Sequence, residues 1–268
     1  MDSDKTNAET KLTESGVSYW IRPDWPAPSN VKSCMTTRIG GISHGPYHSL
    51  NLGNHVGDDS HQVHKNRAQL TSLLNLPAPP VWLDQVHGTK ILELPLESAA
   101  GIPKPGSSPQ ADGSFTRQTD QVCVVMTADC LPVLLCDIQG TVVAAVHAGW
   151  RGLAAGVIEN TVRSMTAPPH SLLAWLGPAI GPDAFEVGQE VVSAFVERQP
   201  EAHHAFRQIS KDHWLADIYA LARLRLRKAG VTQISGGGFC TYHESDRFYS
   251  YRRDKITGRM AALIWLAA

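Results

Sequence analysis

The chain has 268 residues, of which 43% are hydrophobic and 18% charged, and its formal net charge is −1. This composition predicts a soluble globular protein and gives no reason to expect a nucleic-acid or membrane partner. Its five cysteines form no CxxC pair, which predicts a reduced, cytoplasmic protein. Residues 1–17 are polar and lack an apolar core, so we expect a frayed start and not a signal peptide, followed by one domain over residues 18–268.

The first quarter of the chain predicts an edge strand, a long loop and a helix. Residues 18–25 are aromatic and end at prolines, as edge strands often do, and a short strand ends near Met35. The loop that follows carries Arg38 just before two glycines, which let a ligand approach the backbone, so Arg38 is a candidate anion contact. A solvated arginine is the alternative. Residues 58–74 predict a packing helix.

The next segment contains a histidine at a break in a predicted strand. Residues 81–94 predict a strand interrupted at 85–88, where His87 precedes a glycine. A bulge or strand end there can turn the side chain toward a site, although a structural histidine is the alternative. Residues 97–110 are rich in Pro, Gly and Ser and predict a surface loop, lid or tolerated insertion. We interpret Asp112, which follows, as a turn residue.

Three short apolar runs, at residues 122–127, 131–136 and 142–146, predict strands with both faces buried. If Asp137 and Gly140 flank a two-residue turn, counting back along each strand places Cys130 directly opposite His147. Opposed Cβ atoms lie roughly 4.5–5.5 Å apart, close enough for a thiolate and an imidazole to share a metal ion or a proton. A longer turn breaks this pairing, and a buried thiol beside a satisfied histidine is the alternative.

The second half of the chain predicts alternating helices and strands. Helices are expected up to Met165 and over residues 187–197 and 215–228, and strands over residues 172–176, 234–241 and 260–266. Arg151 stands between a strand and a helix, where it can bind an anion together with free backbone amides or cap a carbonyl instead. Near the end, a predicted ligand-facing turn contains Tyr249, Tyr251, Arg252 and Arg253.

His87, Cys130 and His147 together form a candidate metal site. Zn²⁺ suits two nitrogen ligands and one sulfur ligand, and three protein ligands leave a fourth position for water or substrate. Copper is compatible with the same donor types, and the spacing of the three residues matches no local zinc motif. Without metal, Cys130 beside His147 forms the dyad of a cysteine hydrolase.

Six motifs together resemble the purine nucleoside phosphorylase family once called polyphenol oxidase or multicopper laccase-like, which includes a peptidoglycan-editing factor. In chain order they are TTRIGGISHGPYHSLNLG, QVHG, TADCLPVLL, AVHAGWRG, GPAIGPDAFEVG and CTYHESDRFYSYRRDKITGR. The resemblance covers residues 18–268, and the third and fourth motifs carry most of its specificity.

The resemblance implies a mixed α/β (α+β) catalytic domain of the cysteine-hydrolase-like type, a layered sandwich of mixed β-sheets flanked by helices. It also implies zinc held by His87, Cys130 and His147. The implied reactions are phosphorolysis of adenosine, inosine and methylthioadenosine to ribose 1-phosphate and a free base, and adenosine deamination at the same site. The older label of the family implies copper-dependent phenol oxidation.

Further candidate roles follow from the same motifs. We expect Arg38, Arg151 and Asn51 to hold substrate or phosphate, and Cys130, His147 and Asp129 to take part in catalysis. Asp129 can orient a ligand or take a proton, although side chains alternate along a strand and turn it away from the side of its neighbour Cys130.

Three alternatives to a phosphorylase stay open. The chain could be a cysteine hydrolase or amidase that edits a peptidoglycan precursor, a copper-dependent laccase, or a non-catalytic regulator that binds a nucleotide. No coiled-coil heptads occur in the sequence, so a monomer is expected.

Overall fold

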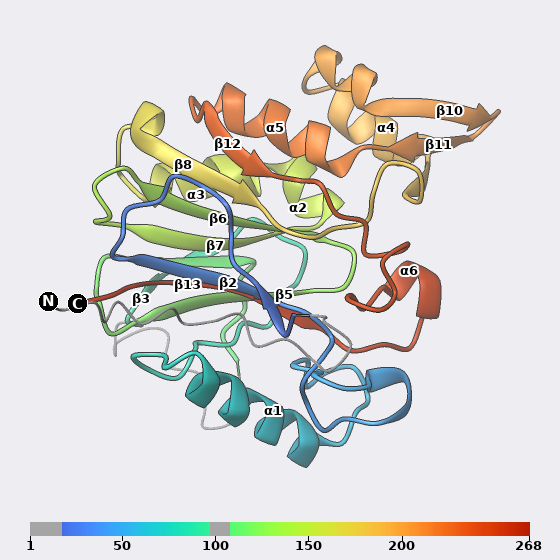
Figure 1. Ribbon diagram of the computed structural model, residues 1–268. Coiled ribbons are helices and arrows are strands. Elements are labelled where there is room, and N and C mark those ends of the chain that lie inside the picture. The colour runs from blue at the N-terminus through green and yellow to red at the C-terminus, as the bar shows by residue number, and fades with distance from the viewer. Residues whose placement is uncertain (1–17, 97–107) are drawn as a thin grey trace, which may run out of the picture.

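The computed structural model of the protein describes residues 18–96 and 108–268, which form four stacked layers (Figure 1). Helix α1 forms one outer layer, a four-stranded and a six-stranded sheet form the middle, and the remaining longer helices form the other outer layer. The predicted sandwich of sheets flanked by helices is therefore confirmed. The predicted frayed start and most of the predicted loop at 97–110 lie outside the described residues. Within the described ranges, no helix is both long and apolar enough to cross a membrane.

The four-stranded sheet is antiparallel throughout and has the order β1-β2-β13-β5. Its strands are β1 (Trp20–Ile21), β2 (Val31–Thr36), β13 (Met260–Leu266) and β5 (Val122–Thr127). Helix α1 (Ser60–Leu73) covers the outer face, and the Asp59 side chain caps it by accepting the His61 backbone N–H. The last strand of the chain thus lies between an early strand and a central one.

The six-stranded sheet is mixed and has the order β12-β8-β6-β7-β4-β3. Its outermost pairs are parallel and the inner pairs antiparallel. The strands are β3 (Ile91–Leu94), β4 (Gly113–Thr116), β6 (Leu131–Asp137), β7 (Val143–Ala148), β8 (Leu172–Leu176) and β12 (Gln233–Gly236). Every residue of β5, β6 and β7 is buried, because one side of each sheet packs against the other sheet and the opposite side against further parts of the chain. This confirms the prediction of strands buried on both faces.

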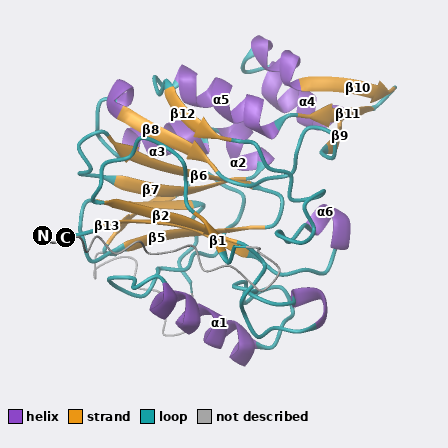
Figure 2. Cartoon of the chain, viewed as in Figure 1, coloured by secondary structure: helices purple, strands orange, loops and turns teal. Residues whose placement is uncertain are grey.

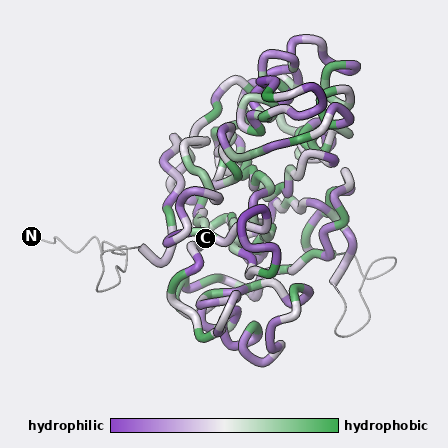
Figure 3. The backbone as a smooth tube through the Cα atoms, turned by 90° about the vertical axis from the view of Figure 1, so that its right-hand side faces the viewer, coloured by the Kyte–Doolittle hydropathy of each residue, from purple (hydrophilic) through white to green (hydrophobic). Residues whose placement is uncertain are grey.

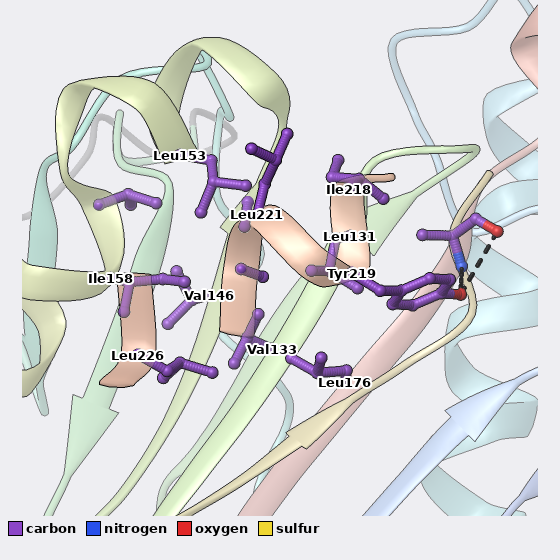
Figure 4. Packing of buried hydrophobic residues seen from close by; sticks show 14 of the residues in the cluster. Leu131, Val133, Val146, Leu153, Ile158, Leu176, Ile218, Tyr219, Leu221 and Leu226 are labelled. Atoms are coloured by element: carbon purple, nitrogen blue, oxygen red, sulfur yellow. Dashed lines mark hydrogen bonds between the residues drawn. The ribbon is translucent and has the colours of Figure 1, made fainter. Parts of the chain in front are cut away.

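Helices cover the outer face of the six-stranded sheet (Figure 4). They are α2 (Trp150–Ala155), α3 (Val157–Ser164), α4 (Gln189–Val196) and α5 (Ile218–Lys228). Leu153, Ile158 and Leu221 pack over Leu131 and Val146 of the sheet. The helix predicted to run unbroken to Met165 is split at Gly156, whose φ of 105° lies in the left-handed region that favours glycine.

The smaller elements lie outside the two large sheets (Figure 2). Strands β9 (Glu186–Gly188), β10 (Phe206–Ser210) and β11 (His213–Ala216) form an antiparallel sheet, and α6 (Tyr251–Asp254) is a single turn. Short 3-10 helices span Gly45–Tyr47, Pro169–Ser171 and Pro200–Ala205. Figure 3 shows hydrophobic stretches through the middle of the molecule and hydrophilic turns at both ends. The sequence predicted neither β10 nor β4, and it assigned the end of β11 to the following helix.

We expect Leu134→Ala to lower the free energy of unfolding by about 2–5 kcal/mol, because it leaves a cavity between the two sheets. Leu134 is fully buried there. The control is Ile138→Ala in the turn after the same strand, where the side chain is 52% exposed and the change should stay below about 1 kcal/mol. Urea unfolding measures both, and equal losses would contradict the inter-sheet packing.

Candidate functional site

The candidate site lies at the corner where the chain passes from one large sheet to the other. Strand β5 belongs to the four-stranded sheet and β6 to the six-stranded sheet, so residues 128–130 must turn between them. Asp129 makes this turn with a φ of 91°, and its carbonyl accepts the Ile180 backbone N–H. Cys130 follows directly, just before β6 begins and close to the end of β7, which carries His147.

The predicted opposition of Cys130 and His147 is wrong by two residues. In the β6–β7 pair, Pro132 lies opposite His147 and Leu131 opposite Ala148. The turn is longer than two residues because the Asp137 carboxylate accepts hydrogen bonds from both Thr141 and Val142. A shift of two residues leaves every side chain on its original face, so Cys130 and His147 still meet diagonally.

The three predicted metal ligands come together. The donor atoms of His87, Cys130 and His147 all lie within 4.8 Å of one another, and Cys130 Sγ is 3.9 Å from His87 Nε2. The two imidazole rings are 4.8 Å apart between centroids and nearly perpendicular. His147 is buried, Cys130 half-buried and His87 exposed. The cluster is therefore anchored in the core on one side and open on the other.

Asp112, interpreted from sequence as a turn residue, instead joins the segments that carry the two histidines. Its fully buried carboxylate binds His147 Nδ1 at 2.9 Å, and it accepts the backbone N–H groups of His87 at 2.9 Å and Gly88 at 2.6 Å. The bond to Nδ1 leaves His147 Nε2 for the cluster. A carboxylate behind a histidine ligand fixes its ring and raises its basicity, as in many zinc sites.

The protonation equilibria of the cluster are coupled. Burial raises the pKa of Cys130, but the charge of His147 and hydrogen bonds from both histidines outweigh it, so the pKa falls. Burial lowers the pKa of His147, but the negative Cys130 and Asp112 outweigh it, so the pKa rises. Burial also raises the pKa of Asp112, and hydrogen bonds from His147 and the backbone bring it below its ordinary value. Cys130 is therefore favoured as the thiolate, the form that binds metals.

Two further residues shape the loop that carries His87. Gln85 binds both backbone groups of Met126, donating to its carbonyl at 2.8 Å and accepting its N–H at 2.7 Å, and so ties residues 85–88 to β5. Gly149 faces the cluster, and a Cβ there would lie 2.8 Å from His87 Cδ2 and 3.2 Å from Cys130 Sγ. The absence of a side chain at position 149 keeps room for the ligands.

A hollow of about 420 Å³ opens beside the cluster. The three predicted ligands line it together with Arg151, Arg259 and the exposed Tyr251. Arg151 and Tyr251 belong to segments that the sequence singled out. Arg259 was not a candidate, although it lies in one of the six motifs, because nothing in its local sequence indicates that it faces the ligands.

Arg38 and Asn51 do not line this hollow within the described part of the chain. The Arg38 guanidinium donates to the carbonyls of His48 and Ser245, both at 3.0 Å. Asn51 is fully buried, and its side-chain oxygen accepts the backbone N–H groups of Gly53 and Arg259, both at 2.9 Å. Their predicted contact with substrate stays a prediction.

The Asp129 carboxylate bonds to the C-terminal segment. It accepts the Thr241 hydroxyl and the Arg252 backbone N–H, both at 2.6 Å. These bonds hold the 241–252 segment against the sheet corner. A catalytic role for Asp129 stays a prediction.

Comparisons with known proteins identify the family. The family model described as multi-copper polyphenol oxidoreductase laccase matches residues 32–267. The chain belongs to this family. Curated relatives carry another name: the purine nucleoside phosphorylase YfiH of Escherichia coli K12 is 55% identical over 250 residues, which cover 93% of this chain and 100% of that protein. The purine nucleoside phosphorylase PA4543 of Pseudomonas aeruginosa is 53% identical, over 93% of this chain and 99% of that protein.

Solved structures agree with the fold. Protein NMB0706 of Neisseria meningitidis, assigned to the family model DUF152, has a TM-score of 0.87 and 50% identity, and the match covers 94% of this chain and 100% of that one. YlmD of Geobacillus stearothermophilus has a TM-score of 0.85 and 32% identity, over 93% and 96% of the two chains. The family and the His-Cys-His cluster together indicate a metal site, and the two nitrogen donors and one sulfur donor fit such a group.

We expect Gly149→Ala to reduce metal binding strongly, because the new methyl group displaces His87 and Cys130. The backbone at Gly149 has φ −62° and ψ 152°, which alanine adopts without strain, so the effect is steric. Gly238→Ala is the matched control, since a Cβ there meets nothing within 4 Å. Metal per chain, measured by mass spectrometry after dialysis, should fall only in the first variant.

We expect Asp112→Asn to lower metal affinity about 10–100-fold, the usual effect of losing a carboxylate behind a histidine ligand. Asparagine places an N–H₂ group against the N–H of Gly88 or of His87 and removes the charge behind His147. Competition with a chelator of known affinity measures the change. Unchanged affinity would show that Asp112 holds the backbone of residues 87 and 88 but does not support metal binding through His147.

Proposed function

We propose that the protein is a zinc-dependent purine nucleoside phosphorylase with adenosine deaminase activity. The observation that carries the proposal is the cluster of His87, Cys130 and His147, which opens into a hollow also lined by arginines. The names of the curated relatives support the same activity. The proposed substrates are adenosine, inosine and methylthioadenosine.

Zinc is the proposed metal because two imidazoles and one thiolate suit it and leave one coordination position open. When bound, zinc supplies a Lewis acid at that open position. The chain's own contribution is to present a thiolate at Cys130, to fix the His147 ring through Asp112, and to keep position 149 free of a side chain.

In phosphorolysis, a phosphate oxygen forms a bond to C1′ of the ribose while the bond from C1′ to the purine nitrogen breaks. The purine leaves with the electron pair and takes the proton that hydrogen phosphate carried, so the products are ribose 1-phosphate and the free base. Arg151 lines the hollow and offers a planar fork of donors for phosphate. In deamination, adenosine and water give inosine and ammonia at the same site.

A cysteine hydrolase or amidase is the second candidate function. Cys130, His147 and Asp112 lie in the order of a nucleophile, a base and an orienting carboxylate. In that reading Cys130 attacks a carbonyl carbon, which metal coordination prevents. The two functions therefore predict opposite effects of metal on activity.

The deciding experiment combines metal analysis with phosphate-dependent release of hypoxanthine from inosine. We expect close to one zinc per chain and release that requires phosphate, with both lost in Cys130→Ala. Cys240→Ser is the control, because this half-buried thiol lies outside the cluster. Among the described residues its Sγ accepts a hydrogen bond from the Gly181 N–H alone, which a serine oxygen can also accept.

Other outcomes separate the alternatives. Metal-free protein that hydrolyses an amide and loses activity on alkylation of Cys130 would replace the phosphorylase by the hydrolase. Nucleoside binding without turnover would favour a regulator, and stoichiometric copper with phenol oxidation would favour the laccase activity that the family model names.

A further inference from the structure

Arg259 is held firmly at the edge of the hollow. It directly precedes β13, its backbone N–H donates to Asn51 Oδ1 at 2.9 Å, and its side-chain stem packs so closely on Gly53 that a Cβ there would lie 2.7 Å from Arg259 Cγ. The side chain is half-buried. Its position is therefore set by the surrounding chain and not by solvent.

The guanidinium of Arg259 keeps one edge free. Nη1 donates to the carbonyls of Thr257 at 3.1 Å and Gly258 at 3.0 Å, which uses its two hydrogens. Among the described residues, no hydrogen bond occupies Nε or Nη2, and no carboxylate forms an ion pair with the group. The remaining donors form the planar fork that binds two oxygens of a phosphate or carboxylate at once.

The lining of the hollow favours an anion. Two arginines, Arg151 and Arg259, contribute to it, and no Asp or Glu does within the described residues. Arg151 is exposed and stacks on Trp150, with its guanidinium carbon 4.7 Å from the ring centre. Burial lowers the pKa of the half-buried Arg259 guanidinium, and the negative charges of Cys130 and Asp129 nearby offset this only in part, so a bound anion stabilises the charge further.

We propose that Arg259 is the principal binding residue for inorganic phosphate, with Arg151 completing the site from its exposed side. This inference rests on the proposed phosphorylase function and adds the residue that holds its second substrate. Arg259 shares one hollow with the cluster, which puts the proposed phosphate site beside the candidate metal site. Asn51 is a positioning residue for this phosphate site, because it orients Arg259 through its backbone N–H.

Three variants of zinc-loaded protein test the proposal: Arg259→Gln, Arg259→Lys and the control Arg207→Gln. Arg207 is an exposed arginine of β10 that pairs with Asp183. We expect Arg259→Gln to raise the phosphate KM and the phosphate Kd from calorimetry about 10-fold or more, because it removes charge-assisted hydrogen bonds. The inosine KM and the zinc content should stay unchanged. Arg259→Lys should give phosphate KM and Kd values between those of the wild type and Arg259→Gln, since lysine keeps the charge but loses the fork of donors.

The outcomes separate this inference from the proposed function. Unchanged phosphate KM and Kd in both Arg259 variants, with normal zinc content, would overturn the inference and leave the phosphorylase intact. Weakened phosphate binding in these variants, in a protein whose wild type shows no phosphorolysis, would support the anion site and reject the phosphorylase. Arg259→Lys carries the test if Arg259→Gln does not fold.

Discussion

A single buried carboxylate, Asp112, connects the parts of the site that come from distant stretches of sequence. It binds the His147 ring on β7 and the backbone of residues 87 and 88, and its own backbone precedes β4 in the same sheet. A buried carboxylate is costly unless it is fully hydrogen-bonded, so these bonds form together or the fold loses stability. The requirement that Asp112 be satisfied therefore fixes the distance between the two histidines.

Other buried polar side chains hold the segments around the hollow in place. Asp129 turns the chain between the sheets and holds Thr241 and Arg252, while Asn51 binds the backbone of Arg259. Both residues can shape the site through these hydrogen bonds without contacting a ligand. The apolar layers set the positions of the strands, and these buried polar side chains set the positions of the loops at their ends, where functional groups collect.

Sequence predicted the parts of this structure that depend on local pattern. The apolar runs gave the strands at 122–127 and 260–266 because a continuous buried run needs no knowledge of its neighbours. The predicted length of the turn after Asp137 was wrong. The length depends on hydrogen bonds from the backbone N–H groups of Thr141 and Val142 to the Asp137 carboxylate, which an apolar pattern does not indicate. The pairing of β13 with β5 was likewise beyond reach, since it joins segments far apart in the chain.

In the candidate site, too, the sequence predicted some residues correctly and missed those whose role depends on contacts between distant segments. His87, Cys130 and His147 were predicted as a group from donor chemistry and from the family resemblance, and they do lie together. Asp112 was misread because its importance depends on β4 lying beside β7, and β4 is too short to be recognised as a strand. Arg38 was selected for its neighbouring glycines, whereas Arg259 reaches the hollow only through the arrangement of β13 beside β5.

The family name and the names of the relatives point to different chemistry, and the lining of the hollow bears on the choice between them. Two histidines and a cysteine are also the donors of blue-copper electron-transfer sites, so donor type does not decide. Such sites transfer electrons and do not need to admit a substrate to the metal. Here one histidine is exposed, the cluster opens into a hollow, and among the residues that the structure describes two arginines but no Asp or Glu line that hollow. A neutral phenol gains little from these cations, whereas a phosphate anion binds to them, so the charge of the hollow supports the proposed phosphorolysis.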